Sequence, residues 1–186
     1  WKIRNTLRVA FIWGFIQNLI AMLVNKVFGI TVITSELRGV LVKADGRSFD
    51  LGVLSRRVVT DAGVAYIVDD WDGGANVIDN FNYHGCGTGT NAEAAGDTQL
   101  QTECTTALNP DSTRATGTKT QPSANQMRTV GTLTFDASAA VTEHGILTQA
   151  ATGGGTLLDR SQFTAINVVS GDSIQFTYTL TLTAGG

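Results

Sequence analysis

Histidine, cysteine, proline and charge are all scarce in this sequence. Its 186 residues include two His, two Cys and two Pro, and only 16% are charged. Average soluble domains carry roughly 25% charged residues, so the surface is either covered by neighbouring subunits or a neutral, Thr-rich β surface. One pair of cysteines, Cys86 and Cys104, does not make a disulfide framework. We expect two isolated reduced thiols, with a disulfide between them as the alternative.

The scarcity of histidine also restricts the chemistry open to the chain. His84 and Cys86 stand at metal-ligand spacing, but a zinc site needs four ligands, or three and a water molecule. The stretch Gly87-Thr88-Gly89 is rich in Gly but lacks the Lys of a phosphate-binding loop. No Gly-x-Ser-x-Gly motif occurs, and a carboxylate pair such as Asp136 with Glu143 cannot be placed from sequence. Because no nucleophile, base and orienting group can be named together, we expect no enzyme activity, no cofactor and no metal.

One acidic stretch, Asp69-Asp70-Trp71-Asp72-Gly73-Gly74, invites comparison with calcium-binding loops. An EF-hand loop needs acids or amides at alternate positions and a Glu at the twelfth. Here Asp70 and Asp72 alternate, but the fifth position is Gly74 and the later Glu is missing. A looser calcium site and a solvated turn with Trp71 packed beneath it both stay open.

Glycine, by contrast, is abundant at 21 residues, and Thr, Val and Ile dominate the second half. Such residues favour short strands joined by tight turns. We expect a hairpin around Asp61-Ala62-Gly63 and a short helical turn over 97–103, capped by Asp97. The spacing of strands predicts a mainly β protein, a β-sandwich of jelly-roll type. The predicted strands cover 30–34, 39–43, 49–54, 57–60, 64–68, 77–83, 114–121, 126–137, 143–149, 157–166 and 173–182.

The N-terminal segment from Leu7 to Phe28 differs from the rest of the chain. It contains no Pro, can be capped by Asn5 or Thr6 and can end at Gly29, so it predicts a helix. Its apolar residues run almost all the way round, as in a helix buried in protein or lying in a membrane. The apolar stretch is short for a membrane span and contains Gln17 and Asn18, which favours a protein interface. We therefore divide the chain into a hydrophobic helical arm (1–28) and a β-sandwich domain (29–186), with five interface anchors in the arm: Phe11, Trp13, Phe15, Leu19 and Leu23.

Charge is distributed unevenly along the chain. Residues 1–57 hold nine Lys/Arg and three acids, which gives +6, whereas residues 58–186 hold four Lys/Arg and thirteen acids, which gives −9. The basic end could meet nucleic acid, anionic lipid or an acidic protein surface, or it could help subunits dock on one another. No motif that reads DNA or RNA is visible, so specific nucleic-acid recognition is not expected.

Several segments resemble a recurrent stretch in structural proteins of tailed bacteriophages. The resemblance covers roughly residues 84–182 and is carried by six segments. They are Gly87-Thr88-Gly89-Thr90 with Gly96-Asp97-Thr98-Gln99-Leu100-Gln101-Thr102-Glu103, then 114–118, 130–135, 141–145, 157–161 and 171–180. The resemblance implies a virion protein and an assembly role, and it supplies no catalytic or cofactor residues. The hydrophobic arm is a departure, since a simple surface-decoration protein would not need it.

These observations predict a capsid cement or decoration protein that binds the major capsid protein or other virion proteins as a homo-oligomer, anchored by its arm. One alternative is a ring-shaped neck, tail or fibre-base component. Another is a module that binds a host glycan on Trp71 and Tyr83. A third is a membrane-anchored virion protein, for which membrane contact by the arm would be required.

Overall fold

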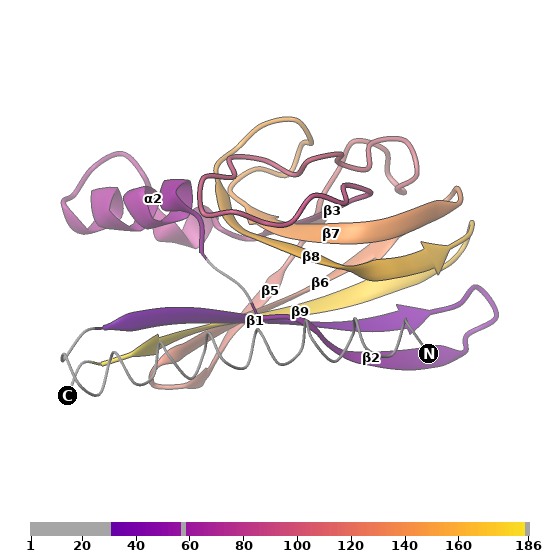
Figure 1. The fold of residues 1–186 in the computed structure, drawn as a ribbon, viewed down its shortest axis with the longest axis horizontal. Helices are drawn as coiled ribbons and strands as arrows, with labels where there is room; N and C mark the ends of the chain where they lie inside the picture. The colour runs from indigo at the N-terminus through magenta and orange to yellow at the C-terminus, as the bar shows by residue number, and fades with distance from the viewer. Residues whose placement is uncertain (1–30, 57–58, 185–186) are drawn as a thin grey trace.

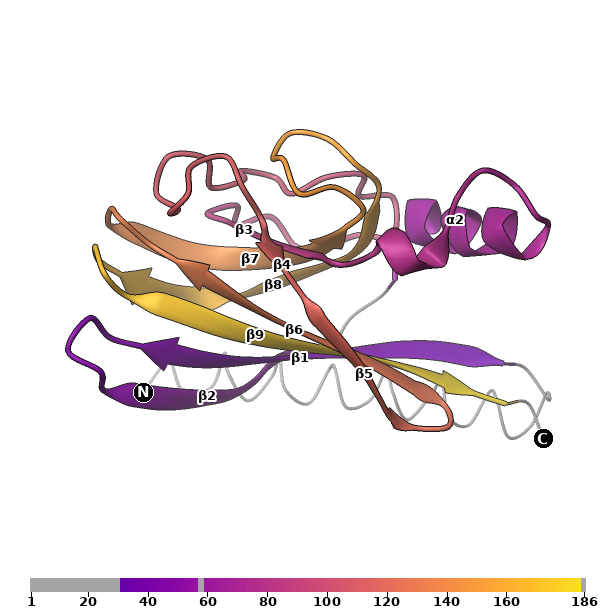
Figure 2. The same cartoon turned by 180° about the vertical axis from the view of Figure 1, so that it is seen from behind.

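The computed structural model describes residues 31–56 and 59–184, which fold into two antiparallel sheets and one α-helix (Figure 1). One sheet has the order β2-β1-β9-β6-β5 and the other has the order β4-β3-β7-β8. Seen from either side, the sheets lie one above the other, with the helix α2 at one end (Figures 1 and 2). The elements are β1 (Val32–Val42), β2 (Ser48–Ser55), α2 (Asp61–Trp71), the 3-10 helix η1 (Ile78–Asn80), β3 (Tyr83–Gly87), β4 (Ala115–Thr116), β5 (Thr118–Ser123), β6 (Gln126–Thr134), β7 (Ala139–Leu147), β8 (Leu157–Val168) and β9 (Ser173–Thr183).

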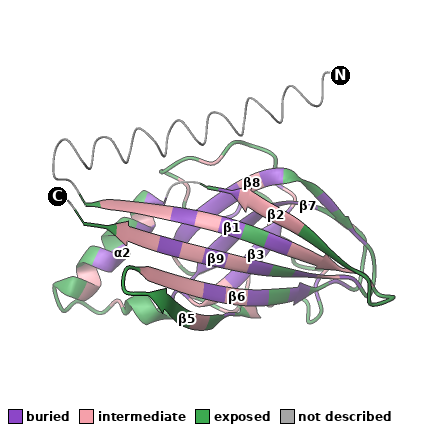
Figure 3. Cartoon of the chain, turned by 90° about the horizontal axis from the view of Figure 1, so that it is seen from below, coloured by how far each residue is buried: buried purple, intermediate pink, exposed green. Residues whose placement is uncertain are grey.

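The central strand of the larger sheet is β9, which pairs along its whole length with β1 and along most of it with β6. Its alternating sequence buries Ile174, Phe176, Tyr178 and Leu180 on one face and leaves Gln and Thr on the other. Strands whose side chains alternate in this way have one face on the core. Figure 3 shows the other face of this sheet, where intermediate and exposed residues predominate on β1, β9 and β6.

The core lies between the two sheets. Leu37 and Phe176 enter it from the larger sheet, whereas Val141 and Ile146 enter it from the smaller one. The rings of Phe163 on β8 and Phe176 on β9 lie 6.1 Å apart and join the layers directly. Each large apolar side chain buried in this way contributes roughly 1.5–3 kcal/mol to folding.

The mainly β prediction is confirmed, and most predicted strands are present. The segments 30–34 and 39–43 belong to one strand, β1, as far as they fall within the described residues. A tight turn follows Lys43, in which the Gly46 N–H donates to the Lys43 carbonyl with Gly46 at φ +85°. The predicted arm, residues 1–28, lies outside the described residues.

The predicted hairpin around Asp61-Ala62-Gly63 is wrong, because this segment is the helix α2. Thr60 caps the helix by accepting the Gly63 N–H on its hydroxyl and donating to the Leu157 carbonyl. Gly63, Tyr66 and Ile67 then face inward, at a helical spacing. The Val and Ile content favours a strand locally, but the cap and the burial of this face prevail.

Two further local predictions, a strand over 77–83 and a helical turn over 97–103, differ from the structure in part or in full. Residues 77–83 are not one strand: they form η1, and β3 begins at Tyr83. The segment 97–103 forms turns rather than a helix, although Asp97 does accept a backbone N–H, that of Ala94. The amides of Gln101 and Thr102, which a helix would have used locally, donate instead to a buried carboxylate.

Candidate functional site

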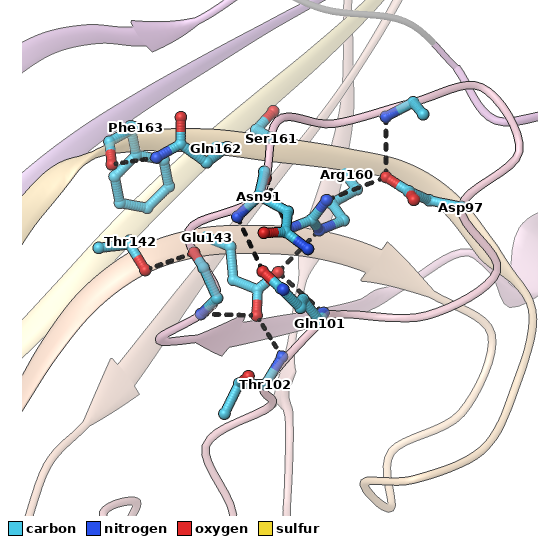
Figure 4. Close-up of polar contacts among 12 residues, drawn as sticks. Asn91, Asp97, Gln101, Thr102, Thr142, Glu143, Arg160, Ser161, Gln162 and Phe163 are labelled. Carbon is cyan, nitrogen blue, oxygen red and sulfur yellow. Dashed lines mark hydrogen bonds and ion pairs between the residues drawn. The ribbon is translucent and has the colours of Figure 1, made fainter.

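The smaller sheet carries a buried ion pair between Glu143 on β7 and Arg160 on β8 (Figure 4). Arg160 Nε donates to Glu143 Oε2 at 2.7 Å, and Glu143 is fully buried. The carboxylate also accepts the backbone N–H groups of Gly89, Gln101 and Thr102 at 2.7–3.1 Å. Three amides from one long loop therefore converge on a single acid.

Arg160 extends this network to the middle of the same loop. It donates through Nη1 to the Asp97 carboxylate at 3.0 Å and through Nη2 to the Asn91 carbonyl at 3.1 Å (Figure 4). Burial works against the charge of Arg160, but the hydrogen bonds to Glu143 and Asp97 outweigh it and raise the pKa of the guanidinium. Burying two charges costs free energy unless hydrogen bonds compensate for the lost hydration. Because the loop of residues 88–103 supplies these hydrogen bonds, the Glu143–Arg160 pair holds the loop against the sheet.

Two glycines at the start of this loop, Gly87 at the end of β3 and Gly89, make room for the carboxylate. A side chain at Gly87 or Gly89 would collide with Glu143. The Gly-rich stretch that lacks a phosphate-loop Lys therefore surrounds an anion of the protein itself. Asp136 is exposed in the turn after β6, and Glu143 finds its hydrogen bonds in the loop and in Arg160.

The two histidines meet between the sheets. Nδ1 of His84 on β3 lies 3.0 Å from Nε2 of His144 on β7, and Nε2 of His84 lies 3.0 Å from the Thr129 hydroxyl on β6. All three residues are buried, and His144 packs on Phe176 with ring centroids 4.5 Å apart. Nδ1 of His144 has no hydrogen-bond partner within residues 31–56 and 59–184.

Thr129, His84 and His144 contact one another in the order of a nucleophile, a base and an orienting group, but all three side chains are buried from solvent. Burial lowers the pKa of His84 to about 3, and burial together with the adjacent His84 lowers the pKa of His144 well below its ordinary value. Both rings are therefore neutral at neutral pH. Because Thr129 is fully buried, its hydroxyl has no route to a substrate in this conformation. The absence of enzyme activity stays a prediction.

A third buried group is the carboxylate of Asp159 on β8. It accepts hydrogen bonds from the hydroxyls of Ser35 at 2.7 Å and Ser161 at 3.1 Å, with the Tyr178 hydroxyl at 3.5 Å. Burial raises the pKa of Asp159 to about 6, against the lowering effect of the two serines. These contacts connect β8 to β1 and β9, so this acid too joins one sheet to the other.

Arg114 and Glu103 form a second ion pair beside a shallow cavity. Arg114 donates to both carboxylate oxygens of Glu103 at 2.6 and 3.0 Å, and its Nη1 donates to the carbonyls of Gln149 and Gly154. The pair holds two loops together, and each nitrogen of the guanidinium donates at least one hydrogen bond. The adjoining cavity of about 250 Å³ is lined by Thr98–Leu100, Glu103, Thr105, Arg114 and Thr152–Gly155.

The two cysteines are free and buried, as expected, but they are not isolated. The Cys104 N–H donates to the Cys86 carbonyl at 2.9 Å. The hydrogen bond between the two thiols, together with burial, raises the pKa of Cys86, while the same bond lowers the pKa of Cys104. In the described part of the chain, no group of three or more His, Cys, Asp or Glu side chains could hold a metal ion.

An apolar stripe is exposed on α2 and consists of Val64, Val68 and Trp71. Their exposed fractions are 42%, 53% and 72%. Residues spaced by four and three positions lie on one face of a helix. Val77 and Ile78, which follow α2, are also exposed, and the Val77 N–H donates to the Tyr66 hydroxyl. The helix therefore presents apolar side chains outward, beside its packed face.

The acidic stretch after Val68 is mostly helical. Asp69, Asp70 and Trp71 form the last turn of α2, and Asp72 is its C-cap. The Asp69 carboxylate accepts the Asn76 N–H, which closes the following turn. Packing of Trp71 beneath the turn is wrong, because this side chain is 72% exposed, more than any other large hydrophobic side chain among residues 31–56 and 59–184.

The residues predicted to bind partners differ in their position and exposure. The anchors Phe11, Trp13, Phe15, Leu19 and Leu23 lie outside the described residues. Trp71 is exposed on α2, whereas Tyr83 is half-buried on β3, where it pairs with Thr116 and Leu147. Sequence reasoning missed the buried polar groups, although Glu143-His144 and Asp159-Arg160 interrupt apolar strands and were a usable signal.

Comparison with protein-family models, with curated proteins and with solved structures found no match. Over residues 31–56 and 59–184, no helix has the length and apolar character needed to cross a membrane.

Proposed function

We propose that this chain is a structural virion protein of a tailed bacteriophage, which binds and stabilises the capsid shell as a homo-oligomeric cement or decoration protein. The observation that carries this proposal is the exposed apolar stripe of Val64, Val68 and Trp71. Contiguous exposed apolar patches on soluble proteins mark surfaces that bind other proteins. The stripe supports a role in assembly, and the resemblance of residues 84–182 supports the phage particle as its place.

The buried polar groups support the same proposal. The Glu143–Arg160 and Arg114–Glu103 pairs fix long loops on the smaller sheet with charge-assisted hydrogen bonds. A decoration protein needs such fixed loops, because a rigid surface loses little conformational entropy when it binds. The finer description of the fold that we propose is a β-sandwich of jelly-roll type, since the chain passes repeatedly between the two sheets, as from β6 to β7 and from β8 to β9.

In this proposal the arm, residues 1–28, is the anchor, and the partner surfaces belong to the major capsid protein and to sister subunits. Phe11, Trp13, Phe15, Leu19 and Leu23 would supply the buried area, roughly 1.5–3 kcal/mol for each side chain. Attachment then needs no covalent chemistry.

Quantitative mass spectrometry of purified particles tests the proposal. We expect a copy number close to that of the major capsid protein, whereas a neck, tail or fibre-base ring would give only the few copies of one ring. A full-length variant with Phe11→Ser, Phe15→Ser and Leu19→Ser should be lost from particles. Phe49→Ser, which removes an exposed aromatic side chain from β2, is the matched control and should be incorporated normally. A chain missing from purified particles would refute the virion assignment.

A further inference from the structure

The stripe on α2 has the spacing of a surface that receives another helix. Val64, Val68 and Trp71 follow one another at four and three positions, the pattern by which helices bind along their length. Val77 and Ile78 are exposed as well, in a segment that the hydroxyl of Tyr66 holds against the packed side of α2. The three side chains of the stripe form one apolar face that runs along the helix.

The border of this face is negatively charged. Between residues 59 and 83 the chain has five Asp and no Lys or Arg. Asp61 lies three positions before Val64, and Asp72 lies four positions after Val68, so both adjoin the stripe and both are exposed. Asp79, near Ile78, is bound by Lys119. A ligand for this face should therefore be apolar along its length and positively charged near its ends.

Residues 1–28 of the chain have this chemistry. They contain Lys2, Arg4, Arg8 and Lys26, and no acid occurs before Glu36. Between Arg8 and Lys26 the sequence is almost wholly apolar. Complementary charge of this kind steers two surfaces together and sets their register.

We propose that the α2 face binds the N-terminal segment, residues 7–28, of a second copy of this chain, so that copies assemble by exchanging arms. This inference rests on the proposed structural function and names its partner. A second copy is favoured because the helix predicted for this segment would be apolar almost all the way round, and one α2 stripe would cover only one side of it. The association of several copies would cover its other sides. An anionic lipid surface fits less well, since Asp61 and Asp72 would be repelled by it.

Photo-crosslinking on the full-length protein tests the contact. A benzophenone amino acid replaces Val68, and copies labelled with ¹⁵N are mixed with unlabelled copies before irradiation. We expect cross-linked peptides from residues 7–28, with labelled and unlabelled peptides joined to each other. Cross-links confined to one isotopic form, or cross-links that miss residues 7–28, would overturn the proposal.

Point variants provide a second measurement, sedimentation equilibrium of the full-length chain. Trp71→Ser and Val68→Asp should weaken self-association at least about tenfold, the size expected for an anchor residue of an interface. Phe49→Ser and Val169→Asp change exposed apolar side chains away from α2, at 44% and 48% exposure, and should leave the association constant within about twofold. Asp61→Lys combined with Asp72→Lys should also weaken association. All of these residues are exposed, so unchanged unfolding curves verify that the variants fold.

The two proposals fail in different ways. If self-association is unchanged in Trp71→Ser, the α2 contact is wrong and incorporation into particles still decides the structural function. If the chain is missing from particles but the cross-links form as expected, arm exchange stands and the virion assignment fails. Binding of the stripe to phosphatidylglycerol vesicles in preference to a second copy would also overturn the proposal.

Discussion

The smaller sheet and the helix α2 distribute polarity in opposite ways. The sheet buries Glu143, Arg160, His84 and His144, whereas α2 exposes a stripe centred on Val68. Burying ionised groups does not by itself stabilise a fold, and exposing large apolar groups costs hydration free energy. Each arrangement therefore needs a purpose other than the stability of one isolated chain.

The two purposes are different. In the sheet, the buried charges are satisfied by the loop of residues 88–103, which has few apolar side chains with which to pack, so the ion pair specifies where the loop lies. On α2, the apolar side chains of the stripe are 42–72% exposed among the described residues and are available to a partner. We infer that the sheet shapes the molecule and that α2 connects it to others.

Removing one partner of the buried pair gives the largest effect that this comparison predicts. Arg160→Met leaves Glu143 as a buried carboxylate without its cation and should lower the free energy of unfolding by about 3–5 kcal/mol. Urea denaturation measures the change. Arg47→Met removes the exposed partner of Asp45 and should cost less than about 1 kcal/mol. Equal losses in both variants would show that the buried pair does not fix the loop.

Acid should destabilise the protein through the two histidines. Their pKa values are lower in the folded state than the ordinary value of 6.5, so the unfolded chain takes up protons first as the pH falls. The stability they contribute is present above pH 6.5 and is lost below it, by about 1.4 kcal/mol per pH unit for each ring, down to a pKa of about 3 for His84.

Asp159 acts in the opposite direction over part of this range. Its folded pKa of about 6 is raised from 3.8, so the stability that it contributes is complete below pH 3.8 and is lost as the pH rises to about 6. Between these values the net loss on acidification should be about 1.4 kcal/mol per pH unit, and Asp159→Asn should roughly double it. Urea denaturation from pH 7.5 to pH 4.5 measures both slopes. A flat profile in the unaltered protein would mean that the histidines do not stay neutral and buried.

The cap of α2 should have a smaller effect. Thr60→Ala removes the acceptor for the Gly63 N–H and the donor to the Leu157 carbonyl, and we expect a loss of about 1–2 kcal/mol. Thr60→Ser keeps both hydrogen bonds and is the control. If the two variants unfold alike, the hydroxyl of Thr60 does not hold the helix that carries the stripe.

Strands were predictable where one face of a sheet is core. From Ile174 to Leu182 every second side chain is apolar, and this alternation alone locates β9. The segment that became α2 was not predictable in this way, because Val64 and Val68 are β-branched yet exposed, and the helix depends on Thr60 and on packing against β8. Local preference cannot anticipate such tertiary contacts.

The candidate sites were less predictable than the fold. His84 and His144 are 60 residues apart, and Glu143 finds its amide donors 41 to 54 residues away. No local spacing encodes these contacts, since they arise when β3, β7 and the loop come together. The exposure of Trp71 could not be predicted from the sequence either, because an acidic turn and the end of a helix have the same amino-acid composition.

Substitution within the stripe should have the smallest effect on the free energy of unfolding. It is the most direct test of the difference between the smaller sheet and α2. Val68 and Trp71 are each more than half exposed among the described residues, so Val68→Ser and Trp71→Ser should change the free energy of unfolding by no more than about 0.5 kcal/mol. Urea denaturation at a protein concentration that keeps the chain monomeric measures this, and Ile67→Ser, on the buried side of the same helix, should cost several times more. A large loss in Trp71→Ser would mean that the ring packs within its own chain. If Trp71→Ser leaves the free energy of unfolding unchanged but weakens association, the Trp71 side chain serves the assembly and not the fold of one chain.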